Sequence, residues 1–268
     1  MRHDFDRIAP DVYVARGCRL DAVGRAKAAV HWSKGAGVIV GLSAAAMHGN
    51  RWLDAELPAE IAIPTYRRPP AWIRTRQAHI ARDECCDIDG YLVTSPARTA
   101  FDLARRLPRK EAVPVLDALC RATKLAPPEV LSFAATHAGD RGCAQVRSVM
   151  PLVDPGAESP PESQTRMLIV ENGLPAPTTQ IVVRNTAGGF LARLDMGWKK
   201  WCVAVEYDGA HHWTDPAQRT KDIDRAAVLA EHGWQVIRTG ANLLYTRPHI
   251  LLDRIEFALS ARGAFLNT

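Results

Sequence analysis

The sequence predicts an α/β protein with two domains, an α+β domain over residues 1–155 and a mixed-sheet α/β domain over residues 156–268. Three observations support this prediction. After residue 156, helix and strand patterns follow one another in the order α-β-β-β-α-β-α. The segment 153–156, Val-Asp-Pro-Gly, is rich in turn-forming residues. Residues 156–268 also hold twelve basic and twelve acidic side chains, so the net charge of +5 lies entirely in residues 1–155.

The elements of the first domain are predicted from apolar runs and capping residues. Ser95-Pro96 begins a helix, because Ser is a favoured N-cap and Pro is favoured at the first helical position. The apolar stretch 38–43 leads into a small-residue helix over 44–48. Strands are expected over 11–16, 61–63, 72–80 and 91–93, and further helices over 20–34 and within 109–150.

The second domain shows a more regular pattern. Helices are expected over 159–173, 220–232 and 250–259, with Thr220 as the N-cap of the second and Gly233 ending it. Strands are expected over 180–184, 190–196, 201–208 and 234–238, with a turn over 185–189.

Composition excludes several classes of protein. The chain is 47% hydrophobic and 24% charged, which is typical of a soluble globular protein. Its six cysteines form no C-x-x-C pair, so the spacing predicts neither a zinc site nor a disulfide framework. No signal peptide and no membrane-spanning apolar run are found. We therefore expect a reduced, cytoplasmic protein without a membrane partner.

Three acidic residues in the second domain indicate metal chemistry. On the strand 201–208, Glu206 and Asp208 project from the same face, because successive side chains alternate. Asp195 lies near the end of the preceding strand. Clustered carboxylates repel one another unless a cation is present, and Mg²⁺ (or Mn²⁺) accepts one or two carboxylates together with phosphate oxygens.

Neighbouring residues extend this constellation. His211 and His212 follow the strand directly, and an imidazole there is suited to general acid–base catalysis. Glu162 on the helix 159–173 is a further candidate carboxylate, but Ser159-x-x-Glu162 also has the form of a structural capping box. Arg225 either pairs with Asp222 on its own helix or reaches across the site toward phosphate.

The motifs SPPESQTR, LARLDMGW, VAVEYDGAHHW and KDIDRAAVLAEHGWQVIR resemble the Vsr-like branch of the PD-(D/E)XK nuclease superfamily over roughly residues 157–260. This resemblance implies a restriction-endonuclease-like fold and Mg²⁺-dependent hydrolysis of DNA phosphodiesters. It assigns Asp195 and Glu206 as the metal pair and Glu162 as the first-helix carboxylate. The superfamily's usual lysine is Asp208 here, which leaves activation of the nucleophile to His211 or His212, or leaves the domain without catalysis.

The first domain resembles a second family. The motifs DVYVARG, VIVGLSAAAMHGN and DGYLVTSPARTAFDLARRL are similar to AbiEi-type regulators of toxin–antitoxin systems. The resemblance implies DNA contact and a cognate toxin or antitoxin as a protein partner. About ten residues precede the VYV strand, so a complete winged helix is not expected before it.

The basic residues of the first domain are the expected DNA contacts. Five arginines lie within sixteen residues that contain no acid, and an aromatic residue accompanies them. Such a strand suits a phosphate backbone, although a solvated edge strand gives the same pattern. The predicted nucleic-acid contacts are Arg67, Arg68, Arg74 and Arg76 here, with Arg225 in the second domain.

Two functions follow from these patterns. The first is a Mg²⁺-dependent DNA endonuclease, with Glu162, Asp195, Glu206, Asp208, His211 and His212 as its catalytic set. The alternative is a DNA-binding regulator or toxin–antitoxin component whose nuclease fold is degenerate. The oligomeric state stays open.

Overall fold

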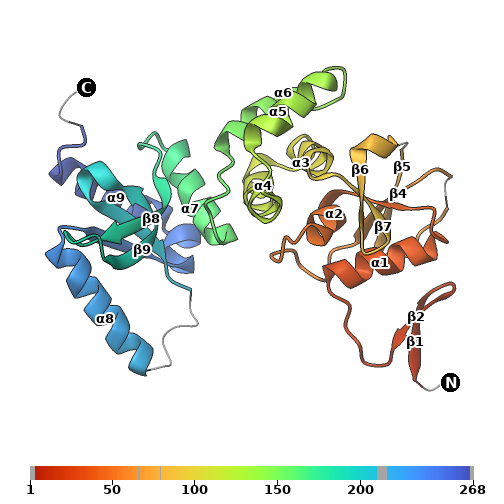
Figure 1. Ribbon diagram of the computed structural model, residues 1–268, viewed down its shortest axis with the longest axis horizontal. Helices are drawn as coiled ribbons and strands as arrows, with labels where there is room; N and C mark the ends of the chain where they lie inside the picture. The colour runs from red at the N-terminus through yellow and green to blue at the C-terminus, as the bar shows by residue number, and fades with distance from the viewer. Residues whose placement is uncertain (1–3, 66, 79, 210–215, 266–268) are drawn as a thin grey trace. The chain divides into compact units, whose positions relative to one another are not determined.

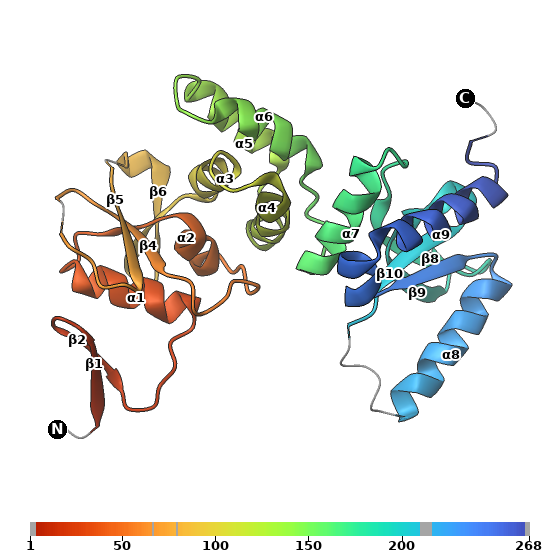
Figure 2. The same ribbon diagram turned by 180° about the vertical axis from the view of Figure 1, so that it is seen from behind.

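The computed structural model describes residues 4–65, 67–78, 80–209 and 216–265, with side chains inside the helix that starts at Pro216 described from Thr220 onward. The chain forms two compact units, Met1–Pro155 (unit 1) and Gly156–Thr268 (unit 2). Their boundary lies in the turn-rich segment 153–156. Both units mix helices with strands (Figures 1 and 2).

Unit 1 contains a five-stranded mixed sheet with the strand order β5-β4-β3-β7-β6. A separate antiparallel hairpin, β1 (Phe5–Ala9) and β2 (Val12–Ala15), precedes it. The strands of the sheet are β3 (Val38–Ile39), β4 (Ala59–Ile63), β5 (Ile73–Gln77), β6 (Cys85–Ile88) and β7 (Tyr91–Thr94).

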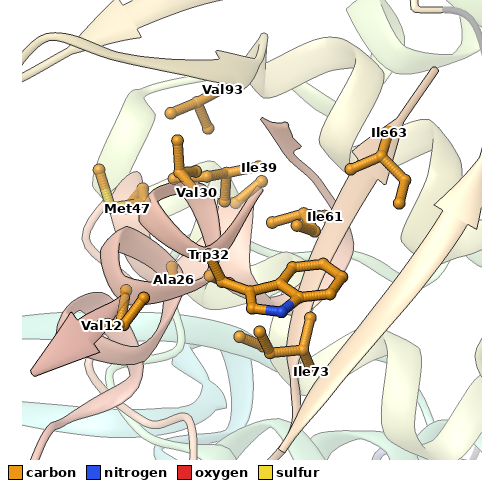
Figure 3. Close-up of a cluster of buried hydrophobic side chains, with 14 of the residues drawn as sticks. Val12, Ala26, Val30, Trp32, Ile39, Met47, Ile61, Ile63, Ile73 and Val93 are labelled. Carbon is orange, nitrogen blue, oxygen red and sulfur yellow. The ribbon is translucent and has the colours of Figure 1, made fainter. Parts of the chain in front are cut away.

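One face of this sheet packs against helix α1 (Ala22–Trp32), which is Ala-rich and can therefore approach the strands closely. Trp32 is 2% exposed and lies against Ile61 and Ile73 (Figure 3). Full burial of such side chains contributes roughly 1.5–3 kcal/mol each. This core fixes the position of β4 and β5.

The remaining helices of unit 1 begin at recognisable signals. Ser95 caps α3 by accepting a hydrogen bond from the Arg98 amide at 3.3 Å, which confirms the start predicted by Ser95-Pro96. The helices are α2 (Gly41–Met47), the short η1 (Arg82–Glu84), α3 (Pro96–Ala104), α4 (Arg109–Thr123), α5 (Pro127–Thr136), α6 (Cys143–Val149) and the short η2 (Met150–Leu152).

Unit 2 is built on a four-stranded sheet with the order β11-β10-β9-β8. β10 pairs antiparallel with β9 and parallel with β11, so helix α8 must cross over between β10 and β11. The strands are β8 (Thr178–Arg184), β9 (Phe190–Trp198), β10 (Val203–Tyr207) and β11 (Gln235–Thr239).

Alternation along β10 assigns its two faces. Val203 and Val205 belong to a core formed with α7 and α9, whereas Ala204 belongs to a core that contains Leu229 of α8. Glu206 therefore projects on the α8 side of the sheet. The helices of unit 2 are α7 (Pro160–Glu171), the short η3 (Lys199–Trp201), α8 (Pro216–Glu231), the short η5 (Asn242–Thr246) and α9 (Pro248–Ala261).

The start of α8 and the strands β1 and β6 differ from the sequence predictions. Helix α8 begins at Pro216, so Thr220 lies inside it and is not its N-cap. Strands β1 and β6 carry no strong alternating pattern and were not expected. Among the residues with described positions, no helix is both long and apolar enough to cross a membrane.

Candidate functional site

Two carboxylates meet on the α8 side of the unit 2 sheet. β10 and β9 run antiparallel, and Val205 pairs with Met196. Glu206, the residue after Val205, therefore lies beside Asp195, the residue before Met196. Both line a cavity of about 260 Å³ whose other charged residues are Asp208, Asp222, Arg193, Arg225 and Arg238. The cavity is therefore a mixed acidic and basic site.

Asp195 carries the most perturbed carboxyl group of this site. Burial, followed by the nearby charges of Glu162 and Glu206, raises the pKa of Asp195 from 3.8 to about 7. The Tyr207 amide donates to Asp195 Oδ2 at 2.9 Å and opposes part of this shift. At neutral pH the fold thus holds a carboxyl group whose charge it does not fully stabilise, which is characteristic of functional sites.

Glu206 is engaged by an arginine from helix α8. Arg225 Nη1 and Nη2 donate to the two carboxylate oxygens of Glu206 at 2.9 and 2.5 Å, and Nη2 also donates to the Arg193 carbonyl at 3.0 Å. The Glu206 hydrogen bond is the main cause that raises the pKa of Arg225. This two-pronged pair is a strong charge-assisted contact and neutralises Glu206 without a metal ion.

Glu162 serves as a helix cap and also lies near the site. Its Oε1 accepts from Ser159 Oγ at 2.8 Å, and its Oε2 accepts from the Glu158 amide at 2.9 Å and from Gln180 Nε2 at 3.3 Å. Ser159 Oγ accepts from the Glu162 amide in return. Ser159 therefore caps α7, but Glu162 accepts from the Glu158 amide and not from the Ser159 amide that a reciprocal capping box requires. The buried charge of Glu162 also raises the pKa of Asp195.

The other predicted site residues have different positions. Asp208 lines the cavity, and its amide donates to the Thr239 carbonyl at 2.7 Å. His211 and His212 lie outside the described residues. Arg193 and Arg238 were not expected in the site; Arg238 reaches it because it pairs in register with Glu206, a relation that only the β10–β11 pairing reveals.

The donor set suits Mg²⁺ by type, because Asp195 and Glu206 supply oxygen ligands from adjacent strands and Mg²⁺ needs only one or two carboxylates. Within the part of the chain that the structure describes, no three His, Cys, Asp or Glu side chains converge as a metal-binding group. Such an ion would also have to compete with Arg225 for the Glu206 oxygens.

In unit 1, three of the predicted DNA-contacting arginines make contacts inside the unit. Arg67 donates to the Trp32 carbonyl at 2.6 Å and lies over the Trp32 ring. Arg74 and Arg76 both face the buried Glu60, at 3.4 and 3.5 Å. Arg68 is exposed.

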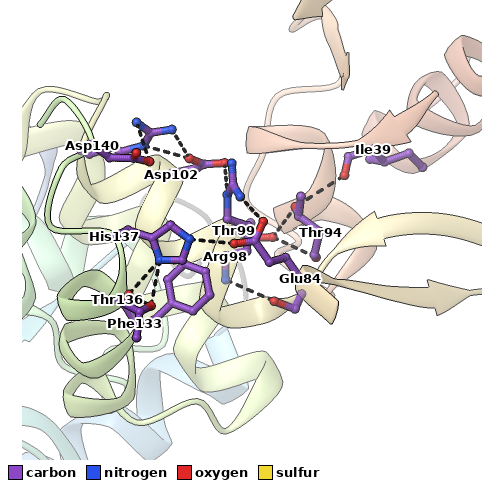
Figure 4. Close-up of polar contacts among 12 residues, drawn as sticks. Ile39, Glu84, Thr94, Arg98, Thr99, Asp102, Phe133, Thr136, His137 and Asp140 are labelled. Carbon is purple, nitrogen blue, oxygen red and sulfur yellow. Dashed lines mark hydrogen bonds and ion pairs between the residues drawn. The ribbon is translucent and has the colours of Figure 1, made fainter. Parts of the chain in front are cut away.

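The most extensive charged network of unit 1 joins η1, α3 and the end of α5 (Figure 4). Asp102 is 1% exposed and accepts from Arg98, Arg105 and Arg106 at 2.9, 2.7 and 3.2 Å. Arg98 also bridges to Glu84, whose other oxygen contacts His137 Nε2 at 2.7 Å. Burial opposes the charge of Arg98, but Asp102 and Glu84 outweigh it and raise its pKa.

Residues 36–152 match the family described as AbiEi antitoxin C-terminal domain. Two uncharacterized proteins of Mycobacterium tuberculosis, MT2308 of strain CDC 1551 / Oshkosh and Rv2248 of strain ATCC 25618 / H37Rv, are each 32% identical to the chain over 252 residues. These residues cover 93% of this chain and 90% of each relative. The chain belongs to the family of these mycobacterial proteins. No solved structure matches it.

The AbiEi match extends from just before β3 to the end of η2. It thus contains the five-stranded sheet and the whole Asp102 network of unit 1, and it excludes the β1–β2 hairpin and α1. Residues 36–152 are therefore AbiEi-like, as the motifs VIVGLSAAAMHGN and DGYLVTSPARTAFDLARRL predicted; the motif DVYVARG lies before the match. The relatives extend over both units, so the two parts occur together in the family.

Proposed function

We propose that the protein is a DNA-binding regulator of the toxin–antitoxin type, with a restriction-endonuclease-like unit 2 that does not cut DNA. The AbiEi match in unit 1 supports the regulatory role and a cognate toxin or antitoxin as a partner. The observation that carries the proposal in unit 2 is the Arg225–Glu206 pair. Arg225 holds both oxygens of the carboxylate that a metal-dependent nuclease would need, so the charge of Glu206 is already balanced.

The first prediction is DNA binding without cleavage. The purified chain is expected to bind duplex DNA in EDTA, with an affinity that falls steeply as salt rises, because arginine–phosphate contacts release counterions. Incubation with plasmid and Mg²⁺ is expected to leave the supercoiled form unchanged. The measurements are fluorescence anisotropy across a salt series and agarose-gel nicking. Mg²⁺-dependent nicking by the wild type would contradict this proposal.

A second candidate function is a Mg²⁺-dependent endonuclease, and the raised pKa of Asp195 favours it. Burial and the charges of Glu162 and Glu206 keep the pKa of Asp195 raised even beside Arg225, and a divalent cation would relieve this repulsion. Asp195 and Glu206 would hold Mg²⁺, which would supply a polarised phosphate and an activated water. Arg193 and Arg238 at the cavity rim would then orient the phosphodiester, and the Tyr207 amide would keep Asp195 Oδ2 in place.

The two functions are separated by variants of the carboxylates. If the chain is an endonuclease, Asp195→Ala and Glu206→Ala are each expected to lower nicking by at least about 100-fold, because a metal ligand stabilises the transition state directly. Lys221→Ala removes a charge from the exposed side of α8 and is the control. Equal nicking by all four proteins would point to a contaminating nuclease and reject the enzyme.

A further inference from the structure

A second hollow of unit 2 runs along the outer edge of its sheet. It has a volume of about 510 Å³ and lies between α8, the edge strand β11 and α9. We call it the β11 groove. Among the described strands β11 pairs only with β10, so its outer backbone groups face this groove.

The side chains of the β11 groove are basic and aromatic. Arg225, Arg238 and Arg254 line it together with Gln235 and Phe257, whereas Glu206 is its one acidic lining residue in the described chain. Arg238 and Arg254 are exposed, and neither side chain makes a hydrogen bond or ion pair with another described residue. Two cationic groups are therefore available to a ligand.

Phe257 adds a flat apolar surface. Its side chain is 74% exposed, and it lies one turn after Arg254 on the same face of α9. An exposed phenyl ring beside unpaired arginines offers a flat face on which a nucleic-acid base can stack. Stacking of this kind requires an unpaired base.

The groove leads to the carboxylate cavity. Glu206, Arg225 and Arg238 line both hollows, so a chain lying along β11 would reach Asp195 without a break. A polyanion matches the arginines, and repeating bases match Phe257. We propose that the β11 groove binds single-stranded DNA, with Arg238 and Arg254 on its phosphates and Phe257 stacked on a base; this inference deepens the proposed DNA-binding function.

The test is anisotropy of a labelled dT oligonucleotide of about 12 nucleotides with the full-length chain in EDTA. The double variant Arg238→Ala/Arg254→Ala is expected to weaken binding about tenfold or more. The plot of log K against log salt should also become less steep, with the negative slope smaller in magnitude by about 1.4. Each of the two lost single-strand phosphate contacts accounts for about 0.7 of this change. Phe257→Ala is expected to weaken binding about fivefold to 100-fold with the slope unchanged.

Matched controls lie elsewhere on unit 2. Phe190 is also exposed, at 63%, and Arg184 is an exposed arginine on β8; neither lines the groove. Phe190→Ala and Arg184→Ala should bind the oligonucleotide as the wild type does. Thermal unfolding of every variant checks the fold, and since the substituted residues are exposed, their transitions should agree with that of the wild type.

The outcomes distinguish this inference from the broader function. Wild-type affinity for the oligonucleotide in all groove variants would show that the groove is not the binding site. The proposed DNA-binding function would then rest on another surface of the protein. Binding of duplex but not of dT would overturn the single-stranded ligand. A chain that binds no DNA of any kind would overturn the proposed function itself, and capture of a peptide strand along β11 without DNA binding would replace it by a protein-binding role.

Discussion

Replacing Asp102 with alanine is expected to lower the free energy of unfolding of unit 1 by about 3–5 kcal/mol. Asp102 is 1% exposed and is shared by Arg98, Arg105 and Arg106, all at least partly buried. Its removal would leave three guanidinium groups near one another without their common counterion. Repulsion among them and their incomplete hydration would both destabilise the folded state.

The free energy of unfolding is measured from amide hydrogen exchange in α3 as the urea concentration rises. The amides of α3 report on unit 1 separately from unit 2. Asp140→Ala is the matched control, because Asp140 contacts Arg105 at 3.6 Å but its side chain is 43% exposed. Exposed pairs contribute at most about 1 kcal/mol. A similar loss for both variants would show that the Asp102 network does not hold α3 in place.

Replacing Asp195 with asparagine is expected to stabilise unit 2 at pH 8. The native pKa of about 7 lies above the usual 3.8, so the folded state holds a proton that the unfolded state has released between these values. Stability therefore falls as pH rises from about 4 to about 7, and the full penalty applies above pH 7. Asparagine carries no charge and can still accept from the Tyr207 amide, so the gain at pH 8 is about 2–4 kcal/mol.

Thermal unfolding of wild type and Asp195→Asn between pH 4 and pH 8 measures this effect. The two curves should converge near pH 4 and separate progressively up to pH 8. Asp208→Asn removes a charge from the same cavity and controls for net charge. A constant difference across this pH range would refute the assigned titration. A stabilising change at Asp195 would identify a carboxylate that is maintained at the expense of stability, as expected for a functional residue.

Local signals predicted much of the secondary structure. Ser95 and Ser159 mark helix starts because each side chain meets an amide three residues ahead, an interaction within one turn. The strands of unit 2 alternate or are buried on both faces, so their apolar residues identify them. Strand β6 escaped prediction because Cys85–Ile88 is only half-buried and pairs with β7 alone. The start of α8 was misplaced because Thr220 resembles an N-cap yet lies within the helix.

The site could be predicted only in part. Glu206 and Asp208 were selected because acids are unusual in strands, and Asp195 because it lies near the end of the preceding strand. All three line the same cavity in the structure. Glu162 contacts the N-cap residue Ser159 and also raises the pKa of Asp195 through its charge, so its two interpretations do not exclude each other. The sequence could not reveal that Arg225 forms an ion pair with Glu206, nineteen residues away, because this contact depends on how α8 packs over the sheet.

The net charge shows the same limit. The excess of +5 lies in residues 1–155, and the arginines there suggested a DNA-binding strand. Folding directs Arg74 and Arg76 to Glu60, and Arg67 to Trp32. The neutral unit 2, in contrast, leaves Arg238 and Arg254 without described counterions. Charge counts along a sequence therefore do not indicate which cations remain available after folding.

Arg225 lies between the carboxylate cavity and the β11 groove, and this position links the two thermodynamically. A ligand in the groove that attracts the Arg225 guanidinium weakens the ion pair between Arg225 and Glu206. Reciprocity then requires that any cation bound by Glu206 increases the affinity of the groove by the same factor. One side chain thus makes occupancy of each hollow a positive effector of the other, and the strength of this cooperativity is set by how much the Arg225–Glu206 contact contributes in the empty protein.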